Sequence, residues 1–289
     1  MKPKPSPGDR LTRKSRHTFM TIFLRPISAL GAFALGVLDF IGGLGYLLLD
    51  TLGVIRPGLL DQRTRRMGWE NLWAQMVRVG VKSVPIVSLV LFCIGAILVL
   101  QMAPILADYG QVHRVADIIS IATFRELGPL VSAIVLTGFA GASIAAEIGT
   151  MVVSEEIEAL DALAIPPVRF LVLPRVVATT VMMICVTVVG DLMGCIGGLA
   201  VANGLLGLSA EQYVARTFDA IRMRDFTTGL VKAGVFGTLI SGLACYLGLG
   251  VTGGAQGVGV ATTRTVVLTI VALIIVDLLF TAVFYAMGW

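Results

Sequence analysis

The fold is decided by residues 125–175, RELGPLVSAIVLTGFAGASIAAEIGTMVVSEEIEALDALAIPPVRFLVLPR. The first part of this segment is an apolar run rich in glycine and alanine, which is typical of a helix that packs closely against others in a membrane. The second part is a short, acidic, amphipathic stretch that ends at Pro166 and Pro167, and a further apolar run follows at once. The segment therefore predicts two membrane spans joined by a short helix outside the membrane.

The composition of the whole chain is that of a multi-pass membrane protein. Of its 289 residues, 56% are hydrophobic and only 14% are charged, and the mean hydropathy is +0.91. Soluble domains do not have this composition. We therefore expect an all-α, multi-pass membrane protein.

Five stretches are long and apolar enough to cross the hydrocarbon core, which is roughly 30 Å thick. They cover approximately residues 83–107, 118–151, 170–203, 226–249 and 265–289. The polar segments 108–117 and 204–225 and the glycine-rich segment 248–264 are predicted to be loops. Residues 83–289 are therefore expected to form the membrane domain.

The N-terminal part is expected to lie outside the membrane core. Residues 1–25 are basic and predicted to be a disordered tail without a cleavable signal peptide. Residues 26–82 are predicted to form an interfacial, amphipathic helical region. Asp39 interrupts the apolar stretch 26–55, although a true span is the alternative. The region before the first span carries 13 of the 22 Lys and Arg residues, which predicts a cytoplasmic N-terminus and hence a cytoplasmic short helix.

The short helix is predicted between Ser154 and Ile165. Ser154 is expected to cap its N-terminus, and Pro166 ends it. Its acidic residues lie on a different face from Ile157 and Leu160. Resting on the membrane surface is the alternative, but an acidic helix gains nothing from an anionic leaflet. The pattern therefore favours contact with a protein partner.

Several ionisable residues border or interrupt the apolar spans. Charged groups are costly in lipid and usually face a bundle interior or a water-filled cavity. The transport-path or gate candidates are Arg125, Glu126, Glu147 and Asp191. Asp277 interrupts the last predicted span. Asp191 lies deepest, and we expect it to find a hydroxyl or basic partner.

Small residues recur at intervals of four in the predicted spans, which allows helix backbones to approach closely. The candidate packing residues are Gly141, Gly149, Gly190, Gly194, Gly198 and Gly237. These rows are suited to contacts within the chain or between two copies of it.

No metal site, catalytic site or nucleotide site is predicted in this chain. The cysteines show no CxxC spacing, and His17 and His113 stand alone. Gly248, Gly250 and Gly253 match G-x-G-x-x-G, but they follow an apolar span and not a β-strand. The chain also lacks a G-x-x-x-x-G-K-[ST] motif, so any ATP must be bound by another chain.

Four motifs resemble the MlaE/YrbE family of permease subunits, which belong to ABC transporters that move lipids together with MCE-domain proteins. The motifs are RELGP at 125–129, ASIAAEIGTM at 142–151, EEIEALDALAIPPVRFLVLPR at 155–175 and ATTRTVV at 261–267. The resemblance extends from about residue 67 to the C-terminus. It implies that residues 83–289 form an MlaE-like permease domain in a bacterial inner membrane, with the plastid inner envelope as the alternative.

The resemblance also implies partners and roles. The permease would be a homodimer with two copies of a separate ATPase that holds ATP and Mg, an outer MCE-domain partner and a lipid path between the two copies. No cofactor would be bound by the chain itself, and no nucleic acid is implied. Glu147 would shape the cavity or gate. The residues expected to couple to the ATPase are Glu155, Glu156, Ile157, Glu158, Leu160, Asp161, Leu163 and Ala164.

Two rival functions remain open at this point. An ion-coupled secondary carrier would use buried acids such as Asp191 and Asp277, although the sequence shows no regular acid/His relay and no inverted repeat. A membrane enzyme acting on lipid would need a nucleophile with a base or a metal cluster, for which the two histidines are too isolated.

Overall fold

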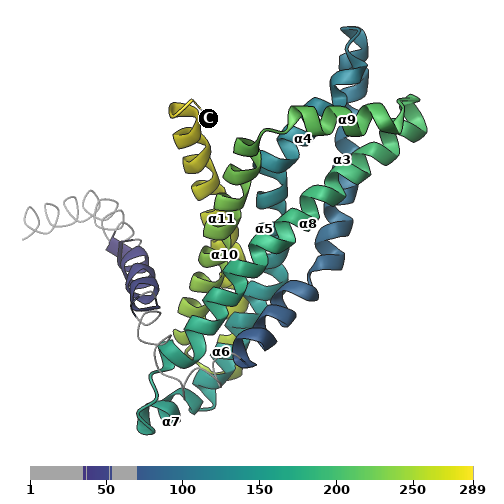
Figure 1. Ribbon diagram of the computed structural model, residues 1–289. Coiled ribbons are helices and arrows are strands. Elements are labelled where there is room, and N and C mark those ends of the chain that lie inside the picture. Colours follow the sequence, from purple (N-terminus) through teal and green to yellow (C-terminus); the bar gives the residue numbers. More distant parts are fainter. Residues whose placement is uncertain (1–34, 37, 52, 54–69, 289) are drawn as a thin grey trace, which may run out of the picture. The chain divides into compact units, whose positions relative to one another are not determined.

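The computed structural model describes residues 35–36, 38–51, 53 and 70–288, and every regular element within them is helical (Figure 1). The chain forms two units, residues 1–46 and 47–289. Residues 38–51 are α-helical, as expected for the apolar part of the N-terminal region. The predicted tail 1–25 lies outside the described residues, and so do residues 26–34, 37, 52 and 54–69 of the predicted interfacial region 26–82.

Five helical segments in the described part of the chain are long and apolar enough to cross a membrane, which confirms the predicted all-α, multi-pass fold. They are Glu70–Asp108, Val112–Val153, Val168–Leu206, Met223–Leu249 and Gly254–Ala286, here called spans one to five.

Within the spans, the α-helices are α3 (Val84–Asp108), α4 (Val115–Ala122), α5 (Gly128–Leu136), α6 (Ala142–Val153), α8 (Leu173–Leu206), α10 (Met223–Leu249) and α11 (Gly254–Ala286). Short π-helical segments interrupt the first three spans: η1 (Val77–Val81), η3 (Thr123–Leu127), η4 (Thr137–Gly141) and η5 (Val168–Val172), and a 3-10 turn, η2 (Val112–Arg114), opens span two. Two shorter helices lie between spans: α7 (Glu156–Ala162) and α9 (Ala210–Ala220).

Three of the four π-helical segments end two to four residues before a proline. Pro85, Pro129 and Pro174 follow η1, η3 and η5, and each occupies the first turn of the next α-helix. Proline has no N–H to donate to the preceding turn and its ring crowds that turn, which favours a local departure from regular α-helical bonding. After η3, for example, the N–H of Gly128 bonds to Thr123 O. The sequence therefore explains why the spans are interrupted at these points.

Two predicted loops contain helices. The loop predicted over 248–264 is wrong beyond Gly253, because α11 begins at Gly254 and the turn is confined to a few residues with Gly253 at φ 87°. Its later glycines lie inside the helix, where Gly257 allows close approach to Thr252 O. The polar segment 204–225 contains α9, which Ser209 caps by accepting a hydrogen bond from the Gln212 N–H at 3.1 Å.

Glycines bring α8 into backbone contact with α3. A Cβ on Gly95 would overlap Gly194 O, and one on Gly197 would overlap Phe92 O. On its other side α8 packs against α10, where Met183, Phe236 and Ile240 form a core. By contrast, α11 leaves most of its apolar surface open. Only 11% of its most apolar stretch is buried inside the protein, against 56% for the corresponding stretch of span four.

We expect Gly237→Ala to destabilise the folded protein. A Cβ there would lie 2.7 Å from Thr180 Cα and 3.0 Å from Thr179 O, so α8 and α10 would have to separate. Overpacking of this kind costs about 1–3 kcal/mol. The matched control is Gly138→Ala, because that helical position has no atom within 4 Å and alanine is the better helix former. Thermal unfolding in detergent should show a lower midpoint for Gly237→Ala only, and an equal fall in both variants would contradict the packing role.

Candidate functional site

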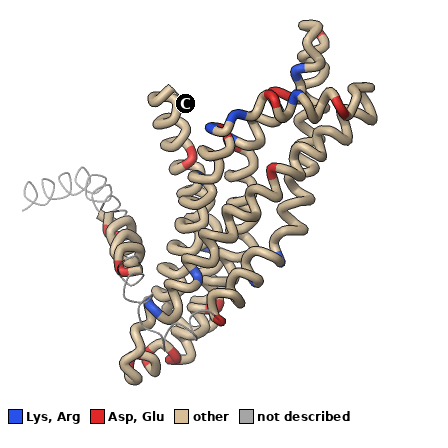
Figure 2. The backbone as a smooth tube through the Cα atoms, viewed as in Figure 1, with Lys and Arg blue, Asp and Glu red and all other residues tan. Residues whose placement is uncertain are grey.

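The charged residues of spans one to five gather toward two ends of the bundle, with few between them (Figure 2). One end carries α7 and the other carries α9 (Figure 1), and these are called the α7 end and the α9 end below. Two charged clusters inside the helical bundle involve the residues that the sequence singled out.

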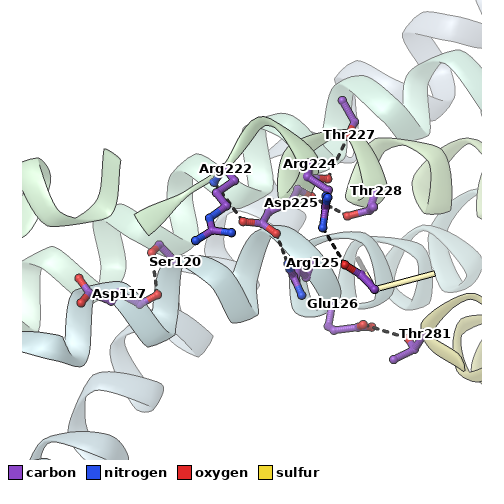
Figure 3. A network of polar contacts seen from close by, with 11 residues as sticks. Asp117, Ser120, Arg125, Glu126, Arg222, Arg224, Asp225, Thr227, Thr228 and Thr281 are labelled. Carbon is purple, nitrogen blue, oxygen red and sulfur yellow. Dashed lines mark hydrogen bonds and ion pairs between the residues drawn. The ribbon is translucent and has the colours of Figure 1, made fainter. Parts of the chain in front are cut away.

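The first cluster is centred on Lys232 of α10 and is called the lysine cluster. The Lys232 Nζ atom donates to Glu126 Oε2 at 2.6 Å, to Asp277 Oδ1 at 2.9 Å and to Thr281 Oγ1 at 2.9 Å. The Thr281 hydroxyl donates in turn to Glu126 Oε1 at 2.9 Å (Figure 3). The cluster therefore links η3, α10 and α11 through one ammonium group.

Because Lys232 is buried, the folded protein requires these partners around its ammonium group. The side chain of Lys232 is only 1% exposed, and an ammonium group in such a place is stable only when charged and polar partners satisfy its protons. Glu126 remains 37% exposed, so one edge of the cluster is open. The sequence analysis identified Glu126 and Asp277 as candidates but not Lys232. A lysine inside a predicted span was nevertheless a signal that those acids had a partner.

Arg125 points away from Glu126 toward the α9 end. Its Nε donates to Asp225 Oδ1, and Asp225 Oδ2 accepts from the Arg222 N–H at 3.0 Å (Figure 3). Asp225 therefore both binds Arg125 and caps the N-terminus of α10. The adjacent Arg125 and Glu126 thus bind different residues of α10, Asp225 at its start and Lys232 about two turns further on, and Glu126 also bonds to Thr281 of α11.

An open pocket of about 1020 Å³ lies beside this pair at the α9 end. Its ionisable lining residues come from span two, from α9 and from the start of α10: His113, Asp117, Arg125, Arg216, Asp219, Arg222 and Asp225. Arg216 and Asp117 face each other at 3.5 Å. The pocket, Arg125 and the lysine cluster form a continuous series of polar groups, here called the polar strip.

The second cluster surrounds Glu147 near the α7 end and is called the Glu147 clamp. Arg78 Nη1 donates to Glu147 Oε2 at 2.7 Å, and Arg78 Nη2 donates to Ser143 Oγ at 2.9 Å. Arg175 Nη2 lies 3.1 Å from Glu147 Oε1, and Arg175 Nη1 donates to Leu171 O at 2.8 Å. The clamp therefore joins spans one, two and three.

Asp191 does not have the partner that we expected. Its side chain is buried on α8 against Gly128, and among the described residues its Oδ1 atom has no hydrogen-bond partner. The close contact with Gly128 follows from the RELGP motif, because any larger residue at 128 would overlap the carboxyl group. The structure does not bring Asp191 together with Glu147.

The residues of α7 divide between two faces. Ile157 packs against the core formed by Ile148, Val172 and Ala244, whereas Leu163 is 70% exposed. Exposed residues on or flanking the helix are Glu155, Glu156, Glu158, Asp161 and Ala164, while Leu160 is intermediate.

The prediction that Ser154 caps α7 is wrong. Glu155 occupies the N-cap position with φ 60°, and the Ser154 hydroxyl bonds to Thr150 O and Glu156 Oε1 instead. The reversal of the chain thus depends on a left-handed residue and not on a side-chain cap.

The six candidate packing glycines all lie at contacts within the chain. Their nearest neighbours in turn are Ile240 for Gly141, Val251 for Gly149, Leu91 for Gly190, Thr123 for Gly194, Tyr213 for Gly198 and Thr180 for Gly237. The four cysteines are free thiols. No group of three or more His, Cys, Asp or Glu residues in the described ranges is placed to hold a metal ion.

The fold and the charged clusters define an all-α, multi-pass membrane protein with polar groups buried between its spans. The profile of the family described as Permease MlaE matches residues 72–283, so the chain belongs to the MlaE permease family, as the motifs predicted. It is a transport component of the ABC-transporter permease class and not a catalytic chain.

The relatives share most of this region. A "Probable ABC transporter permease protein" of Rickettsia felis is 38% identical over 211 residues, which cover 73% of this chain and 82% of the relative. A protein of the same description from Synechocystis is 34% identical over 73% of this chain and 80% of its own length. The Arabidopsis thaliana "Protein TRIGALACTOSYLDIACYLGLYCEROL 1, chloroplastic" is 30% identical over 76% of this chain and 63% of its own length.

We expect Lys232→Met to be strongly destabilising, because it leaves the mostly buried carboxyl group of Asp277 and the partly exposed one of Glu126 without their cation. Breaking a buried ion pair from one side costs about 3–5 kcal/mol. The control is Arg216→Met, which removes an exposed pair worth about 0–1 kcal/mol. Adding Glu126→Gln and Asp277→Asn to Lys232→Met should recover most of the lost stability. Detergent thermal unfolding and yield measure this, and equal effects of the two single variants would contradict it.

Proposed function

We propose that this chain is the membrane permease subunit of an ATP-driven transporter that moves phospholipid or a related lipid. The observation that carries the proposal is the polar strip beside exposed apolar surface. Arg125 and Glu126 are partly exposed, and Ile274 and Leu278, on the same helix as Asp277, are exposed. A lipid has a polar headgroup and apolar tails, and this surface offers both environments side by side.

The relatives support a lipid substrate and a separate energy source. The name of the Arabidopsis relative refers to a glycolipid. The bacterial relatives are described as probable ABC transporter permeases. In this proposal a separate ATPase subunit binds ATP and Mg, and two copies of this chain form a homodimer around the lipid path. The exposed apolar face of α11 is suited to contact with a second copy or with lipid.

α7 is the proposed docking element for the ATPase. It is short, acidic on its exposed side and fixed to the bundle by Ile157, so a force applied to it reaches spans two and three directly. With the N-terminus in the cytoplasm, the α7 end faces the ATPase in the cytoplasm of a bacterial cell. The α9 end then faces the outer side of the inner membrane, where an MCE-domain protein receives or delivers the lipid.

Leu163→Asp tests the docking of α7. Because Leu163 is exposed and Leu160 is partly buried, Leu163 is the better probe of the surface. A charge in the centre of an interface weakens association at least about tenfold, so a Walker-motif ATPase should co-isolate with the wild type and be lost with the variant. Leu205→Asp is the matched control, because Leu205 is also 70% exposed but lies at the other end of span three.

Lipid movement is measured with the permease and its ATPase in proteoliposomes that contain fluorescent phospholipid. The proposal expects lipid transfer to an MCE-domain acceptor that requires ATP. Absence of any ATPase from the wild-type preparation, or transfer that is independent of ATP, would refute it.

An ion-coupled carrier is the second candidate, and the unpaired Oδ1 atom of Asp191 is the observation that favours it. Under that reading Asp191→Asn abolishes transport, and loss of the ATPase has no effect. Under our proposal Asp191→Asn retains ATP-dependent lipid transfer. The two functions therefore give opposite results in the same proteoliposome assay.

A further inference from the structure

The Glu147 clamp lies at the base of the hairpin that carries α7. Span two leads into α7 through α6, and span three leaves it through η5 and α8. Glu147 lies on the last turns of α6, and Arg175 lies on the first turn of α8. Their ion pair therefore connects α6 and α8, the two helices that flank α7.

The two arginines differ in how firmly they are fixed. Arg175 is 4% exposed and also bonds to Leu171 O of η5, so its guanidinium group has little freedom to move. Arg78 is 43% exposed and adds a link from Glu147 and Ser143 to η1. The clamp thus contacts two π-helical segments, η1 and η5, and such segments often occur at functional sites and mark points where a helix departs from regular geometry.

We propose that the Glu147 clamp is the mechanical link that converts movement of α7 into movement of spans one, two and three. Glu147 and Arg175 are positioning residues that make α7 and the bases of spans two and three move as one body, and Arg78 extends that body to span one. This inference rests on the proposed function, because it assigns a role in coupling ATP hydrolysis to lipid movement.

The geometry of the hairpin favours transmission of movement through the Glu147 clamp over a purely stabilising role for it. The α7 helix has only seven residues, and its exposed face is available to a partner. If α6 and α8 could separate, a push on α7 would move α6 away from α8. The movement would then not be passed on to the rest of spans two and three. With the ion pair in place, the same push must move spans two and three together. It also moves span one through Arg78.

The test uses the permease–ATPase complex in proteoliposomes and compares wild type with Glu147→Gln. We measure ATPase co-isolation, the rate of ATP hydrolysis, the amount of lipid moved and the thermal unfolding midpoint. The expected result is retained co-isolation and hydrolysis with lipid moved per ATP reduced about tenfold or more, within the usual range of coupling between sites. The ratio of lipid to ATP is the deciding readout, because a purely structural brace would lower both quantities together.

Two further variants keep the result interpretable. Glu211→Gln makes the same chemical change at an exposed acid of α9 that does not line the pocket, and it should leave the ATPase rate and the thermal midpoint unchanged. Arg78→Gln leaves the buried Glu147–Arg175 pair intact and should reduce lipid moved per ATP by a smaller factor, about twofold to fivefold. It decides the question if Glu147→Gln fails to fold.

An unchanged lipid-to-ATP ratio in Glu147→Gln, or in Arg78→Gln where Glu147→Gln does not fold, overturns the inference. A parallel loss of hydrolysis and lipid movement in Glu147→Gln also overturns it, because the clamp would then only hold the fold. Failure of the wild-type complex to move lipid with ATP is a different result, and it refutes the proposed function itself.

Discussion

The lysine cluster is the constraint on which the arrangement of the second, fourth and fifth spans depends. An ammonium group buried in a membrane protein has to be surrounded by acceptors, and these acceptors come from η3 and α11. The rotation of each helix about its own axis is therefore determined by charge, since turning any of them would leave a charge in an apolar environment. The apolar side chains fill the remaining space, and the many small residues allow the helices to approach closely enough for the charges to meet.

The same principle operates at both ends of the bundle with different consequences. Near the α9 end, Arg125 and Glu126 bind different residues of α10, and part of each side chain remains exposed. Near the α7 end, Glu147 is enclosed between two arginines, one of which is buried. In our proposals the partly exposed groups of the first arrangement face the lipid, and the ion pairs of the second transmit movement of α7. Both clusters include an acid of span two, Glu126 in the first and Glu147 in the second.

Much of the fold could be predicted from the sequence, because length and hydropathy alone mark an apolar span. The five spans, the helix after Val153 and the family membership all follow from such local patterns. The lysine cluster could be predicted only in part. Glu126 and Asp277 stand out as acids in apolar surroundings, but their common partner is separated from them by many residues, and sequence spacing does not show which helices face each other. The start of α11 was missed because closely spaced glycines resemble a loop, although here they accommodate close backbone contacts.

The π-helical segments have a consequence for the register of span two. Each widened turn adds one residue without adding a full turn, and one residue corresponds to about 100° of rotation around a helix. Span two contains two such segments, η3 and η4, between Thr123 and Gly141. Glu126 lies inside η3 and Glu147 lies on α6 beyond η4, so their relative direction depends on the inserted residues. Because η4 lies wholly between the two acids, a regular α-helix of the same sequence would rotate one carboxylate relative to the other by at least about 100°, away from the direction of its present cation.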